Sequence, residues 1–349
     1  MSHDYKAVTW TPFKVRYDRW MFAGIAAYLA GFNVVAAIAV PEGESFVPIQ
    51  TLMRATGSLA LGMLTFILMI GPLARLSDRF KPFLYNRRHL GVTTFLIGLV
   101  HAGLAILWYH GFSEINPLAS VFASNPRYDS LAGFPFESLG FIALMIMLLM
   151  AATSHDFWNA NLGPGLWKAI HMSVYVAYGL LVAHIALGAI QFEKAPVYTW
   201  VLVGSAGLVS ALHILTGLRE RRPPSEAFEG WIKVAAVEDM EDARAKIVRP
   251  EEGEAIAVFR SGRQVSAVSN VCRHQGGPLG EGKIVDGCIT CPWHGFQYRM
   301  EDGCSPPPFT EKIATYATRI EDGLIYVNPT PNDPGTPQAP SLIPQEVAP

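Results

Sequence analysis

The chain has 349 residues, half of them apolar or aromatic, and only 16 % of them are charged. Its net charge of −2 offers no basic field of the kind that binds nucleic acid, so a nucleic-acid partner is not expected. Charge is unevenly distributed, because the first 218 residues hold 23 of the 56 Lys, Arg, Asp and Glu and the last 131 hold 33. This division argues against one soluble enzyme and predicts a membrane part followed by a soluble part.

Six apolar stretches are long enough to cross a bilayer, which takes about 20 residues at a rise of 1.5 Å. Backbone polar groups in lipid need internal partners, so we expect six transmembrane helices. The fourth stretch is the weakest because Glu137 lies near its start. After an N-terminal segment, residues 1–19, the helical domain should cover residues 20–218, with spans at about 20–40, 55–74, 89–109, 135–153, 169–190 and 198–218.

The flanking charges predict the orientation of these spans. Thirteen Lys and Arg lie in the segments on one side and three lie on the other. By the positive-inside rule, both termini and the soluble part face the cytoplasm of a bacterial inner membrane. Lys14, Arg16 and Arg19 before an apolar run that ends in Ala37-Ile38-Ala39 also suggest a cleavable signal, although the run is longer than usual.

Four histidines lie at membrane depth, where an ionisable side chain is by default functional. His89 and His101 lie in the third span, and His171 and His184 lie in the fifth. The spacings of 12 and 13 residues place them in two layers separated by about 18–20 Å. Paired imidazoles suit the two faces of a b-type haem. Neither spacing keeps both histidines on one helix face, so one haem or two haems remain open.

Four stretches lie around these histidines: residues 55–61, residues 71–75 and 87–91 before His101, and Ala152-Thr153-Ser154 before His171 and His184. Together they resemble the ferric reductase-like transmembrane domain, and within it the haem-bearing membrane subunit of the methionine sulfoxide reductase system. The resemblance covers about residues 50–218. It implies that His101, His171 and His184 are haem ligands, whereas the position of His89 varies in that family.

For other polar residues of the helical domain, the sequence makes less specific predictions. His110 and His213 are expected to be structural or interfacial. A group of basic residues suits haem propionates, a flavin phosphate or lipid headgroups, with lipid as the default and a flavin as a possible cofactor. These residues are Arg75, Arg79, Lys81, Arg87 and Arg88.

Beyond a linker at residues 219–229, the sequence changes to short β-type runs separated by Gly, Asp and Pro. A small all-β domain is predicted for residues 230–329, and a disordered Pro-rich tail for residues 330–349. The expected fold is thus a multi-pass α-helical membrane bundle with an appended all-β domain. The runs are residues 255–259, 265–268, 284–285, 287–290, 316–320 and 324–327.

A C-x-H motif, Cys272 and His274, is followed by a C-x2-H motif, Cys291 and His294. Two Cys and two His suit tetrahedral zinc, but zinc sites usually space their cysteines by two to four residues. The pattern instead resembles the Rieske [2Fe–2S] site, in which two thiolates hold one iron and two imidazoles hold the other. Flanking residues that agree are Gly276-Gly277-Pro278-Leu279, Gly295-Phe296 and Ser305-Pro306-Pro307-Pro308.

The resemblance also bears on the cluster potential. Rieske subunits of quinol-oxidising complexes carry an extra Cys in each loop and a Ser that bonds a cluster sulfide. Gln275, Trp293 and Phe296 stand at about these places, and Cys288 and Cys304 lie outside the ligand loops. Fewer donors to sulfur predict a potential nearer to about −150 than to +300 mV. No structural disulfide is expected in a reducing compartment.

Together these features predict a transmembrane electron carrier. A cytoplasmic NAD(P)H- or ferredoxin-dependent reductase would reduce the Rieske cluster, one or two b-type haems would carry the electron onward, and a periplasmic or membrane acceptor would receive it. No G-x-G-x-x-G motif follows a strand, so the reductase is expected to be a separate protein. The alternatives are a component of a Rieske oxygenase system and a membrane-anchored Rieske subunit or sensor without haem.

Overall fold

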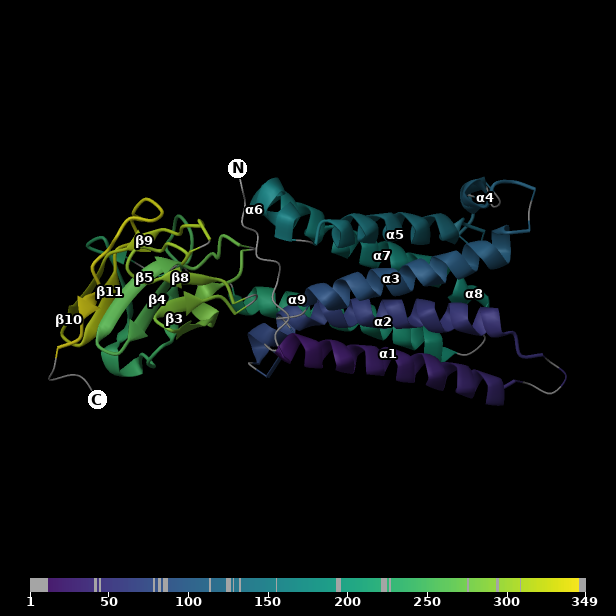
Figure 1. Cartoon of the computed structure of the whole chain (residues 1–349), viewed down its shortest axis with the longest axis horizontal. Coiled ribbons are helices and arrows are strands. Elements are labelled where there is room, and N and C mark those ends of the chain that lie inside the picture. Colours follow the sequence, from purple (N-terminus) through teal and green to yellow (C-terminus); the bar gives the residue numbers. More distant parts are fainter. Residues whose placement is uncertain are drawn as a thin grey trace. The chain divides into compact units, whose positions relative to one another are not determined.

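The fold is described from a computed structural model (Figure 1). The chain divides into two compact units, one containing Val8–Leu218 and one beginning at Arg219. Each unit is described by itself. The structure describes residues 12–40, 43, 45–77, 79–80, 83, 87–112, 114–123, 127, 129–131, 133–154, 156–192, 196–220, 225, 227–274, 276–292, 295–307 and 309–344.

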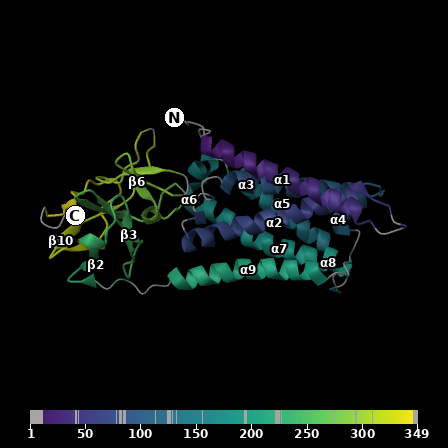
Figure 2. The ribbon, with the colours of Figure 1, turned by 90° about the horizontal axis from the view of Figure 1, so that it is seen from below.

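The first unit is helical. Figures 1 and 2 show its long helices running side by side, with α4 and α8 at one end. We call that end the α4 end, and we call the end at which α2 and α9 terminate and α3 begins the linker end. The helices are α1 (Pro12–Ile38), α2 (Pro48–Leu76), α3 (Arg87–Ala105) continued by a π-helix η2 (Ile106–His110), α4 (Pro117–Ala123), α5 (Phe136–Ala152), α6 (Asp156–Met172), α7 (Val174–Leu187), α8 (Ala189–Phe192) and α9 (Pro196–Glu220).

Length and composition support five of the six predicted membrane spans. The fourth stretch forms α5, an apolar helix of 17 residues that is shorter than the other five. Its end is set locally, because the hydroxyl groups of Thr153 and Ser154 donate to the carbonyls of Leu149 and Met150 at 2.7 and 2.6 Å. Such bonds compete with continuation of the helix.

Two predicted boundaries of the helical domain are corrected. Helix α1 begins at Pro12, inside the predicted N-terminal segment, and residues 156–168, predicted as a loop, belong to helix α6. Hydropathy detects the apolar part of a helix and misses polar turns that extend it. A break at Ser173, whose hydroxyl group donates to the carbonyl of Ile170, separates α6 from α7.

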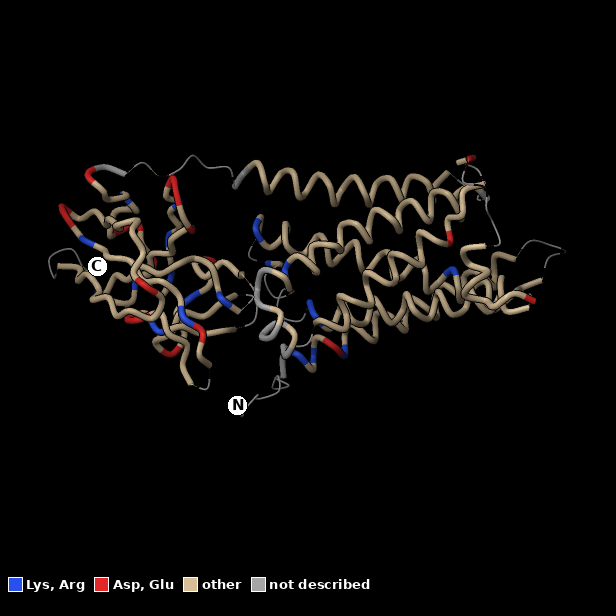
Figure 3. The backbone as a smooth tube through the Cα atoms, turned by 90° about the horizontal axis from the view of Figure 1, so that it is seen from above, with Lys and Arg blue, Asp and Glu red and all other residues tan. Residues whose placement is uncertain are grey.

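The core of the helical unit lies between α2, α3, α5, α7 and α9. Tyr178 is buried within it, and its hydroxyl lies 3.2 Å from that of Thr65 on α2. Figure 3 shows that Lys and Arg of this unit gather at the linker end, while the middle of the helices carries little charge. The core residues are Leu64, Leu68, Phe95, Ala143, Leu144, Met147, Val174, Ala177, Tyr178 and Val209.

The second unit contains three antiparallel sheets. Their strand orders are β1-β2-β11-β10, β12-β5-β4-β3 with β9 on β5, and β6-β7-β8. The strands are β1 (Ala227–Phe228), β2 (Trp231–Ala236), β3 (Ala245–Val248), β4 (Ile256–Ser261), β5 (Gln264–Ser269), β6 (Lys283–Val285), β7 (Cys288–Thr290), β8 (Gln297–Arg299), β9 (Thr315–Tyr316), β10 (Thr318–Glu321), β11 (Leu324–Val327) and β12 (Ser341–Leu342).

Two hairpins of this unit close through Asp-Gly turns. Asp286 and Gly287 join β6 to β7 with φ of +51° and +75°, and Asp322 and Gly323 join β10 to β11 with φ of +48° and +73°. Positive φ at both central residues matches the twist of the flanking strands and favours this residue pair. Strand β1 lies within the predicted linker, so that linker is shorter than expected.

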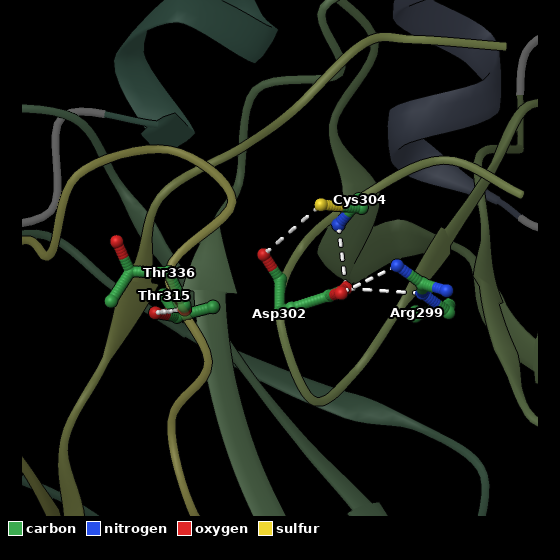
Figure 4. Close-up of polar contacts among 5 residues, drawn as sticks. All are labelled: Arg299, Asp302, Cys304, Thr315 and Thr336. Carbon is green, nitrogen blue, oxygen red and sulfur yellow. Dashed lines mark hydrogen bonds and ion pairs between the residues drawn. The ribbon is translucent and has the colours of Figure 1, made fainter.

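The predicted disordered tail is wrong for residues 330–344. Strand β12 pairs with β5, and Ile343 is completely buried in the core between the first two sheets. The hydroxyl group of Thr315 donates to the carbonyl of Thr336 at 2.9 Å (Figure 4). Proline suits an extended segment that crosses a sheet edge without donating hydrogen bonds, so a Pro-rich composition does not exclude order. Residues 345–349 lie outside the described residues.

Candidate functional site

Two loops of the β unit carry the predicted cluster ligands, and their described residues make the same pattern of backbone hydrogen bonds. In the first loop, the N–H of Cys272 donates to the carbonyl of Gly277 and the N–H of Gly276 donates to that of Cys272, at 2.9 and 2.7 Å. In the second loop, Cys291 donates to Phe296 and Gly295 donates to Cys291, at 2.8 and 2.9 Å. Each loop turns at its glycine, where φ is +74° and +73°. Both thiols are buried in one core with Leu279.

An aromatic group lies against the first loop. The ring of His274 stacks on Phe296 with centroids 5.1 Å apart and planes 6° from parallel, and Phe296 contacts Phe309 at 4.8 Å. The hydroxyl group of Tyr298 accepts from the N–H of Arg273 at 2.9 Å and lies 3.5 Å from the sulfur of Cys272. Its proton is therefore available to a thiolate at Cys272. Burial, followed by the charge of Cys272, raises the pKa of Tyr298.

The donor set fits an iron–sulfur cluster. Cys272 and Cys291 are each 1 % exposed, and Nδ1 of His274 is buried. The hydroxyl group of Ser305, which precedes Pro306 and Pro307, is buried and has no hydrogen-bond partner in the part of the chain that the structure describes. Soft thiolate ligands suit iron–sulfur clusters, and a buried hydroxyl group of this kind is normally satisfied by a group in the site.

The structure thus brings three of the four predicted cluster ligands into two matching loops. The fourth ligand, His294, lies outside the described residues, as do Gln275, Trp293 and Lys81. Among the side chains that the structure does describe, no three His, Cys, Asp or Glu form a group arranged to hold a metal ion. The ligand set therefore remains a prediction.

The two other cysteines lie at either end of this part of the sequence: Cys288 begins strand β7, and Cys304 follows strand β8, which ends at Arg299. Arg299 pairs with Asp302, whose carboxylate also accepts from the N–H of Cys304 at 2.9 Å (Figure 4). Burial alone raises the pKa of Asp302, but these two partners hold it below its ordinary value. Burial, and then the carboxylate of Glu301, raises the pKa of the Cys288 thiol, which reduces its thiolate fraction.

In the helical unit, the imidazoles of His101 and His184 lie together. Their ring centroids are 6.4 Å apart and their planes are 83° apart. In each ring Nδ1 donates to a carbonyl at 2.9 Å, that of Met53 for His101 and that of Phe136 for His184. Because a carbonyl only accepts, Nε2 keeps its lone pair for a metal. An imidazole nitrogen ligates at about 2 Å, so two axial rings on one iron have centroids about 6 Å apart.

A glycine makes room for each of these rings. A Cβ at Gly57 would lie 2.8 Å from Nδ1 of His101, and a Cβ at Gly140 would lie 2.9 Å from Nδ1 of His184. Each glycine follows, by one helical turn, the residue whose carbonyl accepts from the same ring. The pairs α2–α3 and α5–α7 thus carry the same arrangement of carbonyl, glycine and histidine, which fits one haem between His101 and His184.

The other predicted haem layer is arranged differently. Nδ1 of His89 lies 2.9 Å from a carboxylate oxygen of Asp18 on α1. His171 donates from Nδ1 to the carbonyl of Trp167 at 3.0 Å, and its ring stacks on the indole at 3.8 Å. Nε2 of His171 lies 3.4 Å from the hydroxyl of Ser154.

Several residues that define these sites were missed from the sequence. Tyr298 follows the second motif closely enough that its spacing was a usable signal. Gly140, Asp18 and the carbonyl of Phe136 carried no signal, because their partners are distant in the sequence. Asp18 and His89 are separated by 71 residues, and Phe136 and His184 by 48.

Comparisons with known proteins cover both units. Residues 56–182 match the ferric reductase like transmembrane component, and residues 230–317 match the Rieske [2Fe-2S] domain. A protein-methionine-sulfoxide reductase haem-binding subunit of Ralstonia nicotianae is 27 % identical over 197 residues, which cover 56 % of this chain and 83 % of the relative. The anthranilate 1,2-dioxygenase ferredoxin subunit of Burkholderia cepacia is 35 % identical over 100 residues, 28 % of this chain and 91 % of the relative.

Among solved structures, a chain of the complex of reduced oxygenase and oxidised ferredoxin in carbazole 1,9a-dioxygenase is similar, with 27 % identity and a TM-score of 0.28. The match covers 32 % of this chain and 98 % of that chain. The two family matches and the apolar helices define a membrane redox protein of two parts. The helical unit is similar to the ferric reductase like transmembrane component, and the β unit carries a Rieske [2Fe-2S] domain, which is the combination predicted from the sequence.

Proposed function

We propose that the protein carries electrons across a bacterial inner membrane. The electron passes from a cytoplasmic NAD(P)H- or ferredoxin-dependent reductase, through a Rieske [2Fe–2S] cluster and one or two b-type haems, to a periplasmic or membrane acceptor. A [2Fe–2S] cluster and a b-type haem each exchange one electron at a time. The side chains hold these groups, set their potentials and exclude water from them.

One observation carries this proposal: the imidazoles of His101 and His184 are placed as a bis-histidine pair. Their separation of 6.4 Å, the carbonyl acceptors for both Nδ1 atoms and the glycines opposite both rings are all explained by one haem. A purely structural pair would not need a glycine opposite each ring. The relative of the helical unit is itself described as a haem-binding subunit, which supports the same conclusion.

For the Rieske domain we propose the ligands Cys272, His274, Cys291 and His294. The loop geometry and the two buried thiols support these assignments. Tyr298 orients its hydroxyl group between the backbone of Arg273 and the sulfur of Cys272. The relative from Burkholderia cepacia is described as a ferredoxin subunit, which supports a carrier role over an oxygenase role.

A second haem, held by His89 and His171 near the linker end, is proposed as the inner layer. Asp18 would act on His89 as a carboxylate partner that orients the ring and strengthens it as a ligand. Trp167 holds the ring of His171 by stacking and through its carbonyl. The basic residues of this end suit haem propionates, lipid headgroups or a flavin phosphate (Figure 3).

The linker end would face the cytoplasm and the α4 end the periplasm. The charge asymmetry supports this orientation, because 13 Lys and Arg lie in the segments of one side and three lie in those of the other. The Rieske domain follows α9 in the chain and would therefore be cytoplasmic, where a soluble reductase reaches it.

The test is haem and iron stoichiometry on the detergent-purified chain, with a reduced-minus-oxidised visible spectrum and low-temperature EPR. A b-type spectrum together with a Rieske signal is expected. His101→Ala and His184→Ala should remove one haem and spare the cluster signal, and His274→Ala should do the reverse. His89→Ala should remove the second haem. A cluster without any haem would refute transmembrane transfer and leave a membrane-anchored Rieske protein.

A further inference from the structure

A buried polar cluster lies at the α4 end, outside both proposed cofactor sites. His110 is the last residue of the π-helix η2 and is 5 % exposed, and Ser120 on α4 is 4 % exposed. Nδ1 of His110 lies 2.8 Å from the hydroxyl oxygen of Ser120, and its Nε2 lies 3.5 Å from a carboxylate oxygen of Glu137 on α5. Three elements therefore meet at one imidazole. Single-turn π-helices are rare and occur frequently at functional sites.

This imidazole has a partner for each of its nitrogens in either protonation state. When the ring is neutral, Nε2–H faces the carboxylate and Nδ1 accepts from the hydroxyl group of Ser120. When the ring is cationic, both nitrogens donate, because a hydroxyl oxygen also accepts and the carboxylate supplies the opposite charge. A buried histidine of this kind takes up or releases a proton without leaving a polar group unsatisfied. The side chain of Glu137 is 28 % exposed and links the buried ring to solvent.

This group of polar residues is connected to the proposed haem site along helix α5. Glu137 follows Phe136, whose carbonyl accepts from Nδ1 of His184, and Gly140 lies one turn further along α5. The first two turns of α5 therefore carry both the carboxylate and the groups that position a haem ligand. In a low-dielectric surrounding, the charge of Glu137 favours the oxidised iron, and an electron added to the iron raises the proton affinity of the carboxylate and the imidazole.

Among the charged residues near His110, Glu137 is the one that pairs with it in the described part of the chain. Helix α4, which packs on η2, contains no titratable side chain, and Glu137 is the only titratable residue of α5. The connecting segments contribute Glu114, Arg127 and Asp129, all of which are exposed. Among the described residues, the one ion pair of His110 is with Glu137.

We propose that His110, Ser120 and Glu137 form a proton-exchange site coupled to the haem between His101 and His184. When this haem gains one electron and its iron passes from ferric to ferrous, one proton from the solution at the α4 end binds to the His110–Glu137 pair. When the haem is reoxidised, the same proton is released. The proposal rests on the proposed function in one respect, since it requires a haem at this pair.

The test is a redox titration of the haem absorbance at several pH values between about 5 and 8, the range in which histidine changes charge. It uses the full chain in detergent, with His110→Gln and Glu137→Gln as variants. His213→Gln is the matched control, because His213 bonds Tyr175 and the carbonyl of Val209 and contacts no carboxylate among the described residues. In the wild type and in the control, the affinity of the haem for an electron should fall about tenfold per pH unit, which is about 59 mV.

In His110→Gln and in Glu137→Gln, the affinity of the haem for an electron should fall less than about twofold per pH unit. Infrared difference spectra should also show a carboxyl band that changes on reduction in the wild type and is absent in Glu137→Gln. If His110→Gln does not fold, Glu137→Gln and Ser120→Ala carry the test. A normal haem spectrum with a pH-independent potential, or an unchanged pH dependence in the variants, would overturn this proposal alone. A wild type without a haem spectrum would overturn the proposed function.

Discussion

Replacing Gly140 by alanine tests the haem site through a single methyl group. The new Cβ would lie 2.9 Å from both Cε1 and Nδ1 of His184, whereas unstrained contacts begin at about 3.5 Å. The ring must therefore move by about 0.6 Å, or rotate away from the carbonyl of Phe136. Loss of such an orienting contact typically costs 10–100-fold in affinity for the bound metal, or about 1.4–2.7 kcal/mol. Gly57→Ala should act in the same way on His101, because its Cβ would lie 2.8 Å from that ring.

The assay is haem retention and haem affinity of the purified variants, with the Rieske EPR signal as an internal measure of intact protein. Gly62→Ala is the matched control, because it lies on the same helix as Gly57 and a Cβ there meets nothing within 4 Å. Alanine in a helix interior is favoured over glycine by about 0.5–1 kcal/mol, so the control should bind haem at least as well as the wild type. Wild-type haem affinity in both Gly57→Ala and Gly140→Ala would refute the assignment of His101 and His184 as a ligand pair.

Three further predictions concern the Rieske domain. Tyr298→Phe removes the hydroxyl group 3.5 Å from the sulfur of Cys272 and should lower the cluster potential in an EPR-monitored titration; an unchanged potential would count against this role. Ile343→Ala should destabilise the domain by about 2–5 kcal/mol in a denaturant titration, whereas Leu342→Ala, which is 61 % exposed, should stay within about 0.5 kcal/mol of the wild type. Because the pKa of Asp302 is lowered in the fold, its carboxylate contributes stability above its unfolded pKa of about 3.9 and loses it as the pH falls through the lower folded value. Asp302→Asn should therefore melt below the wild type at neutral pH, and the difference should narrow below about pH 4; an equal difference at both pH values would contradict the assignment.

Much of the fold was predictable because its signals are local. The run of residues 324–327 predicted strand β11 with both boundaries correct, and the helices were visible as long apolar stretches. Family resemblance came from motifs with short internal spacing, which the comparisons confirm. Hydropathy did not find the polar part of α6, because those residues are helical without being apolar.

The C-terminal segment shows a different limit of composition. Proline-rich sequence with few aromatic residues is typical of disorder, yet Ile343 is completely buried and Ser341 pairs with Val265 of β5. The buried side chain, the strand pairing and hydrogen bonds such as that from Thr315 to the carbonyl of Thr336 hold this segment against the rest of the domain. The sheet edge and the core that receive it lie elsewhere in the sequence, so the segment itself does not reveal them.

The sequence by itself determined the class of protein: a helical membrane part, a Rieske domain and histidines at membrane depth. It could do so because hydrophobic length and the C-x-H and C-x2-H spacings are properties of single short segments. Only the tertiary structure decided which groups meet. The carbonyl and glycine that position each of His101 and His184, and the glutamate that faces His110, lie on other helices. Contacts across tens of residues depend on how helices pack, which no local pattern encodes.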